Sequence, residues 1–214
     1  MARAIKTESS KPSLEVVDLC CIRDDLVLFS ELNFTLHSQQ ILLIHGRNGC
    51  GKTSLLRLLA GLGLPDEGDV QWRGQSIEKL KSDYYQQLSY VGHHDGIKGD
   101  LTAAENLRVA VALGQPSGLS VDSALEQVNL YGYEDILCHA LSAGQRRRVA
   151  LSRLLVTSSQ LWILDEPFTS LDVDGIALFE QLMVTHVERG GLIVLTSHHP
   201  IDLPDIELIR LDLS

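Results

Sequence analysis

The sequence predicts an α/β domain built on a parallel sheet, and three observations lead to this prediction. Residues 41–45 form a short apolar run that leads into a glycine-rich loop, and residues 54–59 continue as a helix. Residues 161–164 and 192–196 are apolar runs of the kind found in parallel strands that are buried on both faces. Residues 101–155 have a sequence pattern typical of helices. The expected order is a sheet lobe, a helical insert at about residues 95–155, and a sheet lobe again.

The other elements are assigned in chain order. Residues 14–19 and 26–36 alternate in hydrophobicity like antiparallel strands, and a charged turn at Arg23 separates them. Residues 61–68 are rich in turn residues, and strands are expected at 70–72 and 88–92. A capped helix is expected to start at residues 101–105, and an amphipathic helix at 121–130. We expect residues 1–13 to be a disordered tail and residues 14–214 to form a single domain, which suits a length of 214 residues.

The composition excludes several classes of protein. With a formal net charge of −10, we expect no nucleic-acid partner, because nucleic acid is itself a polyanion. The one basic run, residues 146–148, is expected to be a solvated helix face. No run of eighteen apolar residues occurs, so no membrane span is expected. The first thirteen residues lack an apolar run, so no signal peptide is expected, and the chain is placed in the cytoplasm.

The cysteines give no sign of a zinc or redox centre. Cys20, Cys21, Cys50 and Cys138 lack CxxC spacing, and no CxxCH haem attachment motif is present. We expect four free thiols in a reducing compartment.

A phosphate loop follows the strand at 41–45. Its pattern is Gly, four residues, then Gly-Lys-Thr, and glycines there let backbone N–H groups surround phosphates. Lys52 is expected to reach the terminal phosphates, and the Thr53 hydroxyl to ligate Mg²⁺. A chance glycine-rich turn is the alternative, which the flanking strand and helix disfavour. The expected nucleotide-binding residues are Gly46, Arg47, Asn48, Gly49, Cys50, Gly51, Lys52, Thr53 and Ser54.

Two carboxylates end the apolar strand at 161–164. Asp165 is suited to hold Mg²⁺ through water at the carboxyl end of the strand, where α/β sheets bind their ligands. Glu166 is suited to polarise a water that attacks the γ-phosphate. Alone, the pair could equally be a polar turn that ends the strand before Pro167.

A second anion-binding element is expected where a helix begins near Gln145. The Ser142 hydroxyl and the free N–H groups of the first turn could bind a phosphate, although Ser142 could equally be a plain N-cap. The element comprises Leu141, Ser142, Ala143, Gly144 and Gln145. Ser170-Leu171-Asp172 and a Thr-Ser-His at residues 196–198 add to the pattern.

These five elements, in this order, resemble the nucleotide-binding domain of the ATP-binding cassette (ABC) family from about residue 14 to the C-terminus. The resemblance implies a P-loop NTPase fold of the ABC type, with a mixed or parallel core sheet, N-terminal antiparallel strands and a helical insert lobe. It also implies an ATPase that sandwiches two ATP molecules in a head-to-tail homodimer. The catalytic residues it implies are Glu166, His198 and Lys52, and the metal ligands are Thr53 and Asp165.

The resemblance assigns the remaining motifs to the contact between two copies. Residues 141–145 become the signature, whose Ser142 and Gly144 contact the partner's γ-phosphate. Ser170, Leu171 and Asp172 become the dimer-contact loop, and His198 contacts the γ-phosphate and the attacking water.

Residues 92–98, 101–103, 161–169 and 172–175 more narrowly resemble the ATPase subunits of cytochrome c biogenesis (haem exporter) transporters. This implies membrane-spanning permease partners of the CcmB-like and CcmC-like kind, at the cytoplasmic face of the bacterial inner membrane. The function that this resemblance implies for the transporter is haem export or the release of a haem-loaded chaperone. The alternatives are another small ABC exporter, a ribosome- or chromosome-associated ATPase, which would need tandem cassettes or a coiled-coil insertion, and a degenerate regulatory cassette.

The chain departs from the family in two places. The coupling loop has His93 or His94 where the family carries glutamine, and Arg23 stands near the position of the adenine-stacking aromatic ring. Direct haem ligation is not expected, because His45, His93, His94 and His198 are assigned to the surroundings of the nucleotide.

Overall fold

The computed structural model describes residues 13–201, 203 and 206–213. The expected tail therefore lies outside the described residues, apart from Ser13, which begins the first strand. None of the helices in the described ranges combines the length and apolarity that a membrane crossing needs.

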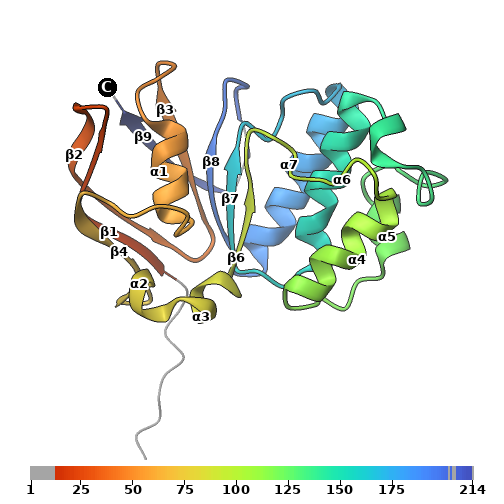
Figure 1. The fold of residues 1–214 in the computed structure, drawn as a ribbon, viewed down its shortest axis with the longest axis horizontal. Helices are drawn as coiled ribbons and strands as arrows, with labels where there is room; N and C mark the ends of the chain where they lie inside the picture. Colours follow the sequence, from red (N-terminus) through yellow and green to blue (C-terminus); the bar gives the residue numbers. More distant parts are fainter. Residues whose placement is uncertain (1–12, 202, 204–205, 214) are drawn as a thin grey trace, which may run out of the picture.

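An antiparallel sheet forms one side of the molecule (Figure 1). In it, β1 (Ser13–Arg23) pairs with β2 (Leu26–His37) and with β4 (Glu67–Trp72), and β5 (Gln75–Ser76) extends β4. The β1–β2 hairpin turns at Asp24 and Asp25, whose φ angles are 48° and 63°. Aspartate is among the residues that adopt this left-handed conformation most readily, which is why the charged turn closes a tight hairpin.

The core sheet is parallel throughout. Its order is β6 (Leu88–Val91), β7 (Leu161–Asp165), β8 (Leu192–Thr196), β3 (Gln40–Gly46) and β9 (Glu207–Leu213). Every residue of β7 and β8 is buried, which explains their unbroken apolar runs. Because parallel strands end at the same edge, the segments that follow β3, β6, β7 and β8 meet there.

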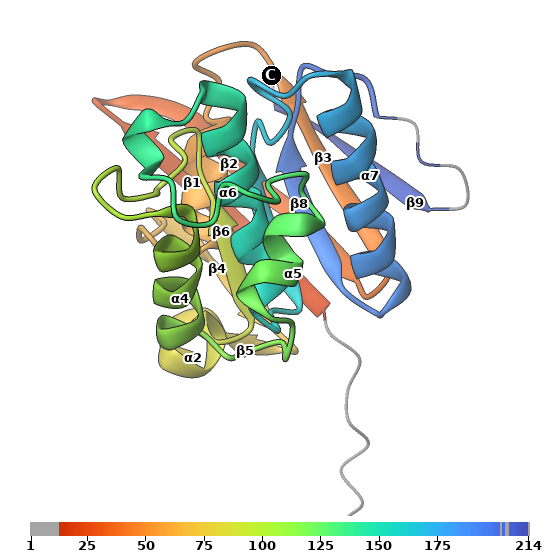
Figure 2. The same ribbon diagram turned by 90° about the vertical axis from the view of Figure 1, so that its right-hand side faces the viewer.

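Helices fill the space on both faces of the core sheet. The helix α1 (Lys52–Leu59) lies between the two sheets, and its leucines at 55, 56, 58 and 59 are buried in a core that both sheets share. On the opposite face lie α6 (Ala143–Val156) and α7 (Val173–Glu188) (Figure 2).

The segment between β6 and β7 is helical. It contains α4 (Ala103–Leu113), α5 (Val121–Glu126), the short η1 (Cys138–Ala140) and α6, which share a smaller core of their own. Two one-turn helices, α2 (Ile77–Leu80) and α3 (Ser82–Tyr85), connect β5 to β6. The α/β fold expected from the sequence is confirmed, including the N-terminal antiparallel strands.

Several sequence expectations differ from the structure in detail. The helix expected at 121–130 ends at Glu126, and α6 begins at Ala143 rather than near Gln145, because Ser142 caps it. The helix α7 and the strand β9 were not expected. The run at 146–148 is not a solvated face, since Arg147 is only 2% exposed.

Candidate active site

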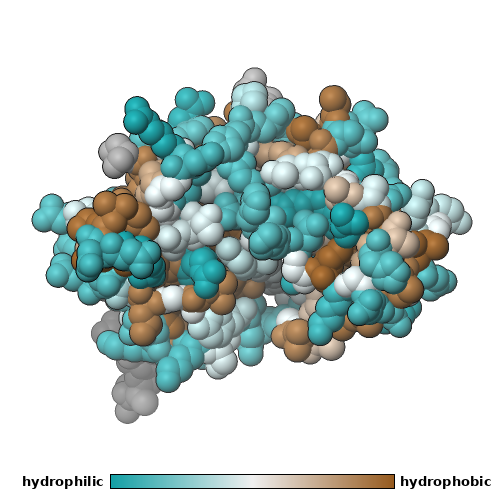
Figure 3. All heavy atoms as spheres, turned by 45° about the horizontal axis from the view of Figure 1, so that its top comes forward, coloured by the Kyte–Doolittle hydropathy of each residue, from teal (hydrophilic) through white to brown (hydrophobic). Residues whose placement is uncertain are grey.

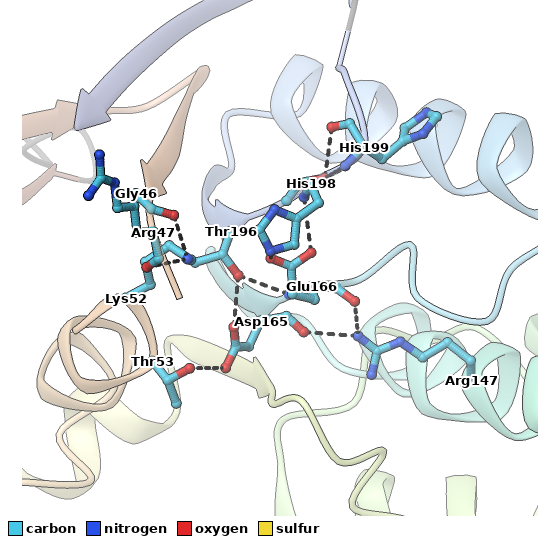
Figure 4. Close-up of polar contacts among 11 residues, drawn as sticks. Gly46, Arg47, Lys52, Thr53, Arg147, Asp165, Glu166, Thr196, His198 and His199 are labelled. Atoms are coloured by element: carbon cyan, nitrogen blue, oxygen red, sulfur yellow. Dashed lines mark hydrogen bonds and ion pairs between the residues drawn. The ribbon is translucent and has the colours of Figure 1, made fainter. Parts of the chain in front are cut away.

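The phosphate loop leaves the end of β3 at a point that admits only glycine. Gly46 has φ 153°, and a Cβ there would lie 2.4 Å from the Leu213 carbonyl oxygen and 2.5 Å from the Cys50 sulfur. The Lys52 ammonium donates to the Gly46 carbonyl at 2.8 Å and to the Arg47 carbonyl at 3.2 Å (Figure 4). Both of these acceptors are neutral, so the lysine is a cation available to phosphate oxygens.

Asp165 is held by two hydroxyl groups at the end of β7. The Thr53 hydroxyl donates to Oδ2 at 2.8 Å, and the Thr196 hydroxyl donates to Oδ1 at 2.7 Å. Asp165 is 2% exposed, so these bonds fix its carboxylate where β7 meets the start of α1. A carboxylate next to a threonine hydroxyl is an oxygen donor set of the kind that Mg²⁺ prefers, and these residues therefore fit that ion.

Glu166 follows with its backbone at φ 49°, an unusual conformation for a residue with a side chain. Its amide N–H donates to the Thr196 hydroxyl at 3.0 Å. The His198 amide donates to Oε2 at 3.1 Å, and the His198 Nε2 lies 3.6 Å from Oε1. Oε1 is buried and accepts no hydrogen bond from the residues that the structure describes. A buried carboxylate oxygen of this kind can accept a hydrogen bond from a further donor such as water.

A cavity of about 520 Å³ joins these groups. Besides the two carboxylates and His198, it is lined by the phosphate loop and the start of α1, by Leu28 of β2, by His93 and by Thr169. The full set is Leu28, Asn48, Gly49, Gly51, Lys52, Thr53, Ser54, His93, Asp165, Glu166, Thr169 and His198.

The histidines that the sequence analysis assigned to the surroundings of the nucleotide differ in whether they reach the cavity. His93 lines the cavity, whereas His94 and His45 do not. Of the two histidines expected in the coupling loop, His93 is therefore the one at the cavity, and His45 lies outside the cavity, contrary to expectation. His45 lies in β3 and pairs in register with Asp212 of β9.

Three residues of the loop do not line the cavity. Gly46, Arg47 and Cys50 are not among the lining residues, and Cys50 packs against the apolar core beside α1. Arg23 also stays outside the cavity, because it donates to the Ile22 carbonyl at 2.8 Å and lies 3.9 Å from the Asp66 carboxylate. Leu28 is an apolar side chain that lines the cavity.

The signature does not face the cavity of its own chain. Ser142 accepts from the Gln145 amide at 3.2 Å, and the Gln145 side chain accepts from the Ser142 amide at 2.9 Å, which is a complete capping box. Gly144 packs against residue 170 so closely that a Cβ would lie 2.8 Å from the Ser170 carbonyl oxygen.

The loop at residues 170–172 is tied to the signature helix. Asp172 caps α7 by accepting from the Gly175 amide at 2.9 Å, and it pairs with the Arg148 guanidinium of α6. The Gly175 N–H and then Arg148 hold the pKa of Asp172 below its usual range. The carboxylate is therefore charged and joins the starts of α6 and α7.

Sequence reasoning gave no role in the site to three contributors. Thr196 precedes the Ser-His pair, and its place at the end of an apolar strand could have drawn attention to it. Arg147 donates to the backbone carbonyls of Asp165 and Glu166, and no sequence signal distinguishes it from its two arginine neighbours. Leu28 is separated from the phosphate loop by a whole strand, so only the fold brings it there.

Comparisons with known proteins show the family to which the chain belongs. A family model described as ABC transporter matches residues 29–169. The cytochrome c biogenesis ATP-binding export protein CcmA of Photobacterium profundum is 48% identical and aligns with 86% of this chain and 92% of its own length. The CcmA of Nitrosospira multiformis is 47% identical over 95% of this chain and its whole length.

Solved structures match the fold. A putative ABC transporter ATP-binding protein from Pyrococcus furiosus has a TM-score of 0.78 at 22% identity, covering 94% of this chain and 97% of that one. A dimeric ATP-binding cassette in a post-hydrolysis state, bound to ADP and phosphate, has a TM-score of 0.76 at 20% identity, covering 87% and 88%. The chain therefore belongs to the ATP-binding subunits of ABC transporters and, among them, to the family of cytochrome c biogenesis ATP-binding export proteins.

Proposed function

We propose that this chain binds and hydrolyses ATP and thereby drives the membrane subunits of a transporter that serves c-type cytochrome biogenesis. The observation that carries the proposal is the convergence of three chain segments on one cavity. The phosphate loop supplies Lys52 and Thr53, the end of β7 supplies Asp165 and Glu166, and the segment after β8 supplies His198.

Each residue has a chemical task that its contacts support. When ATP binds, the Lys52 ammonium would give up its hydrogen bonds to the loop carbonyls and donate to the terminal phosphate oxygens instead. Thr53 and Asp165 would hold Mg²⁺, which when bound neutralises charge on those phosphates. Glu166 orients the attacking water and accepts its proton, and His198 holds the Glu166 carboxylate in place.

The signature supports a composite site made by two copies of the chain. Residues 141–145 do not line their own cavity, although the start of α6 presents N–H groups of the kind that bind anions. In the proposed head-to-tail homodimer, Ser142 and Gly144 contact the ATP of the partner. Permease subunits, CcmB-like and CcmC-like, would hold the dimer at the cytoplasmic face of the inner membrane.

The Glu166→Gln variant tests the hydrolytic step. Glutamine keeps the shape but cannot take a proton, so we expect the turnover of ATP to fall by about 10²–10⁴-fold. Binding of ATP should persist, because the phosphate loop is intact. The exposed residue Glu188 on α7 provides the control, since Glu188→Gln removes a carboxylate outside the cavity and should leave turnover unchanged. Wild-type turnover in Glu166→Gln would contradict the assigned base.

The cellular part of the proposal has its own test. A strain deleted for this chain should lose c-type haem in its spectra, and a plasmid with the wild-type chain should restore it. The Glu166→Gln chain should not. Normal cytochrome c in the deletion strain would overturn the role in biogenesis while leaving the ATPase activity standing.

A further inference from the structure

Arg147 joins two segments of the site that are distant in the sequence. It lies on α6, its residue is 2% exposed, and its Nη1 contacts the segment after β6. That nitrogen donates to the Gly92 carbonyl at 3.1 Å and pairs with the Asp95 carboxylate at 3.1 Å. The same segment carries His93, which lines the cavity.

The other edge of the guanidinium contacts the segment after β7. Nη2 donates to the carbonyls of Asp165 at 3.0 Å and Glu166 at 2.7 Å, and Nε donates to the Pro167 carbonyl at 3.1 Å. Figure 4 shows the guanidinium directed at the backbone just beyond the two carboxylates. Three consecutive carbonyls therefore accept from one rigid side chain.

The contact between Arg147 and the Glu166 carbonyl lies at a residue whose backbone conformation is strained. Glu166 has φ 49°, a conformation in which the Cβ crowds the following carbonyl. Such conformations persist only where the surroundings hold them. Here the Glu166 carbonyl is held by Arg147 at 2.7 Å, and its amide N–H by Thr196 at 3.0 Å. The direction of the Glu166 side chain thus depends on both partners.

We propose that Arg147 is a positioning residue for hydrolysis: it fixes the backbone of the general base and ties it to the loop that carries His93. A displacement of that loop, on which permease subunits are expected to act, then reaches Glu166 through one guanidinium. The inference rests on the proposed ATPase function. An arginine is required because its planar fork serves several acceptors at once, whereas lysine is a point charge.

The alternative is that Arg147 only anchors α6 to the sheet. That role predicts a loss of thermal stability with no selective loss of turnover. The positioning role predicts that kcat falls while KM for ATP is kept, because the phosphate loop is untouched.

The test compares Arg147→Lys with Arg153→Lys in the full chain, assayed with the subunits that copurify with it. Arg153 lies on the same helix and donates to the carbonyls of Asp95 at 3.4 Å and Gly96 at 3.1 Å, so it contacts the loop but not the segment after β7. We expect kcat of Arg147→Lys to fall by about 100-fold with KM within about threefold of wild type, and Arg153→Lys to stay within about threefold in both.

Asp95→Asn provides a second variant in case Arg147→Lys does not fold. Asp95 is partly exposed. Replacing its carboxylate by a neutral amide leaves the four contacts of Arg147 with backbone carbonyls in place. We expect its kcat to fall by about tenfold at constant KM.

Two results would overturn the proposal: kcat of Arg147→Lys within threefold of wild type, or an equal loss in Arg153→Lys. If Arg147→Lys does not fold, an unchanged kcat in Asp95→Asn overturns it. A wild-type chain without ATPase activity would instead contradict the proposed function itself.

Discussion

At the scale of single residues, the site depends on hydroxyl groups that hold carboxylates. The hydroxyls of Thr53 and Thr196 donate to different oxygens of the Asp165 carboxylate. The Thr196 hydroxyl also accepts a hydrogen bond from the Glu166 amide. Because Asp165 is 2% exposed, a lost hydroxyl there would leave a buried acceptor without a partner. The precision of the site therefore comes from threonines as much as from the charged residues.

The histidine pair gives a prediction at the same scale. His93 lines the cavity and His94 does not, so only His93 is placed to act on a bound nucleotide or its water. A glutamine oxygen at residue 93 could serve a metal-bound water as well as an imidazole does. We expect His93→Gln to keep ATPase activity within about threefold and His93→Ala to lose about tenfold.

Steady-state ATPase rates, with His94→Ala as the control, check this prediction. His94→Ala should leave the basal rate unchanged. A His93→Gln variant without activity would show that the imidazole has a task that an amide cannot perform.

At the scale of elements, the start of α6 has two roles. Ser142 caps the helix, and it is also the signature serine proposed to contact the ATP of a second copy. Ser142→Ala should cost about 1 kcal/mol of stability through the lost cap, whereas Ser142→Asn keeps a capping side chain.

Both substitutions should spare ATP binding, since Ser142 does not line its own cavity, and both should abolish most hydrolysis. Urea unfolding separates the stability effect from the ATPase effect. If Ser142→Asn hydrolysed ATP at the wild-type rate, the cap alone would be the role of this serine.

At the scale of the whole molecule, the structure leaves some apolar side chains exposed and partly buries one titratable ring. Apolar atoms gather at the left of Figure 3. In the β1–β2 hairpin, Leu26 and Val27 are 62% and 53% exposed. His186 of α7 is partly buried, and its ring stacks on Trp162 of β7 at 3.9 Å between centroids. Burial lowers the pKa of His186 from 6.5 to about 4, partly offset by hydrogen bonds to the backbone.

This histidine predicts how stability depends on pH. The unfolded chain takes up a proton near pH 6.5 and the folded chain only near pH 4, so acid favours unfolding. The contribution of His186 is complete above pH 6.5 and is lost as the pH falls to 4, by about 3 kcal/mol in total.

Denaturant unfolding at several pH values measures the effect against His186→Phe, which keeps an aromatic ring on Trp162 and has no proton to gain. The free energy of unfolding of the variant should fall less steeply between pH 6.5 and 4. Parallel curves for the two proteins would contradict the assignment to His186.

The sequence by itself predicted the N-terminal antiparallel strands, the core strands at 41–45, 161–164 and 192–196, the helical insert and the residue types of the site, but neither α7 nor β9. Strand-ending carboxylates, a glycine-rich loop and a capping serine are local patterns, and the apolar runs placed them on parallel strands whose carboxyl ends must meet. Only the tertiary structure decided which of two adjacent histidines faces the cavity and that Leu28 reaches it. It likewise decided that Arg147 is buried between the segments that follow β6 and β7. These outcomes depend on packing between segments separated in the chain, and adjacent residues of one type differ only in the direction in which the fold turns them.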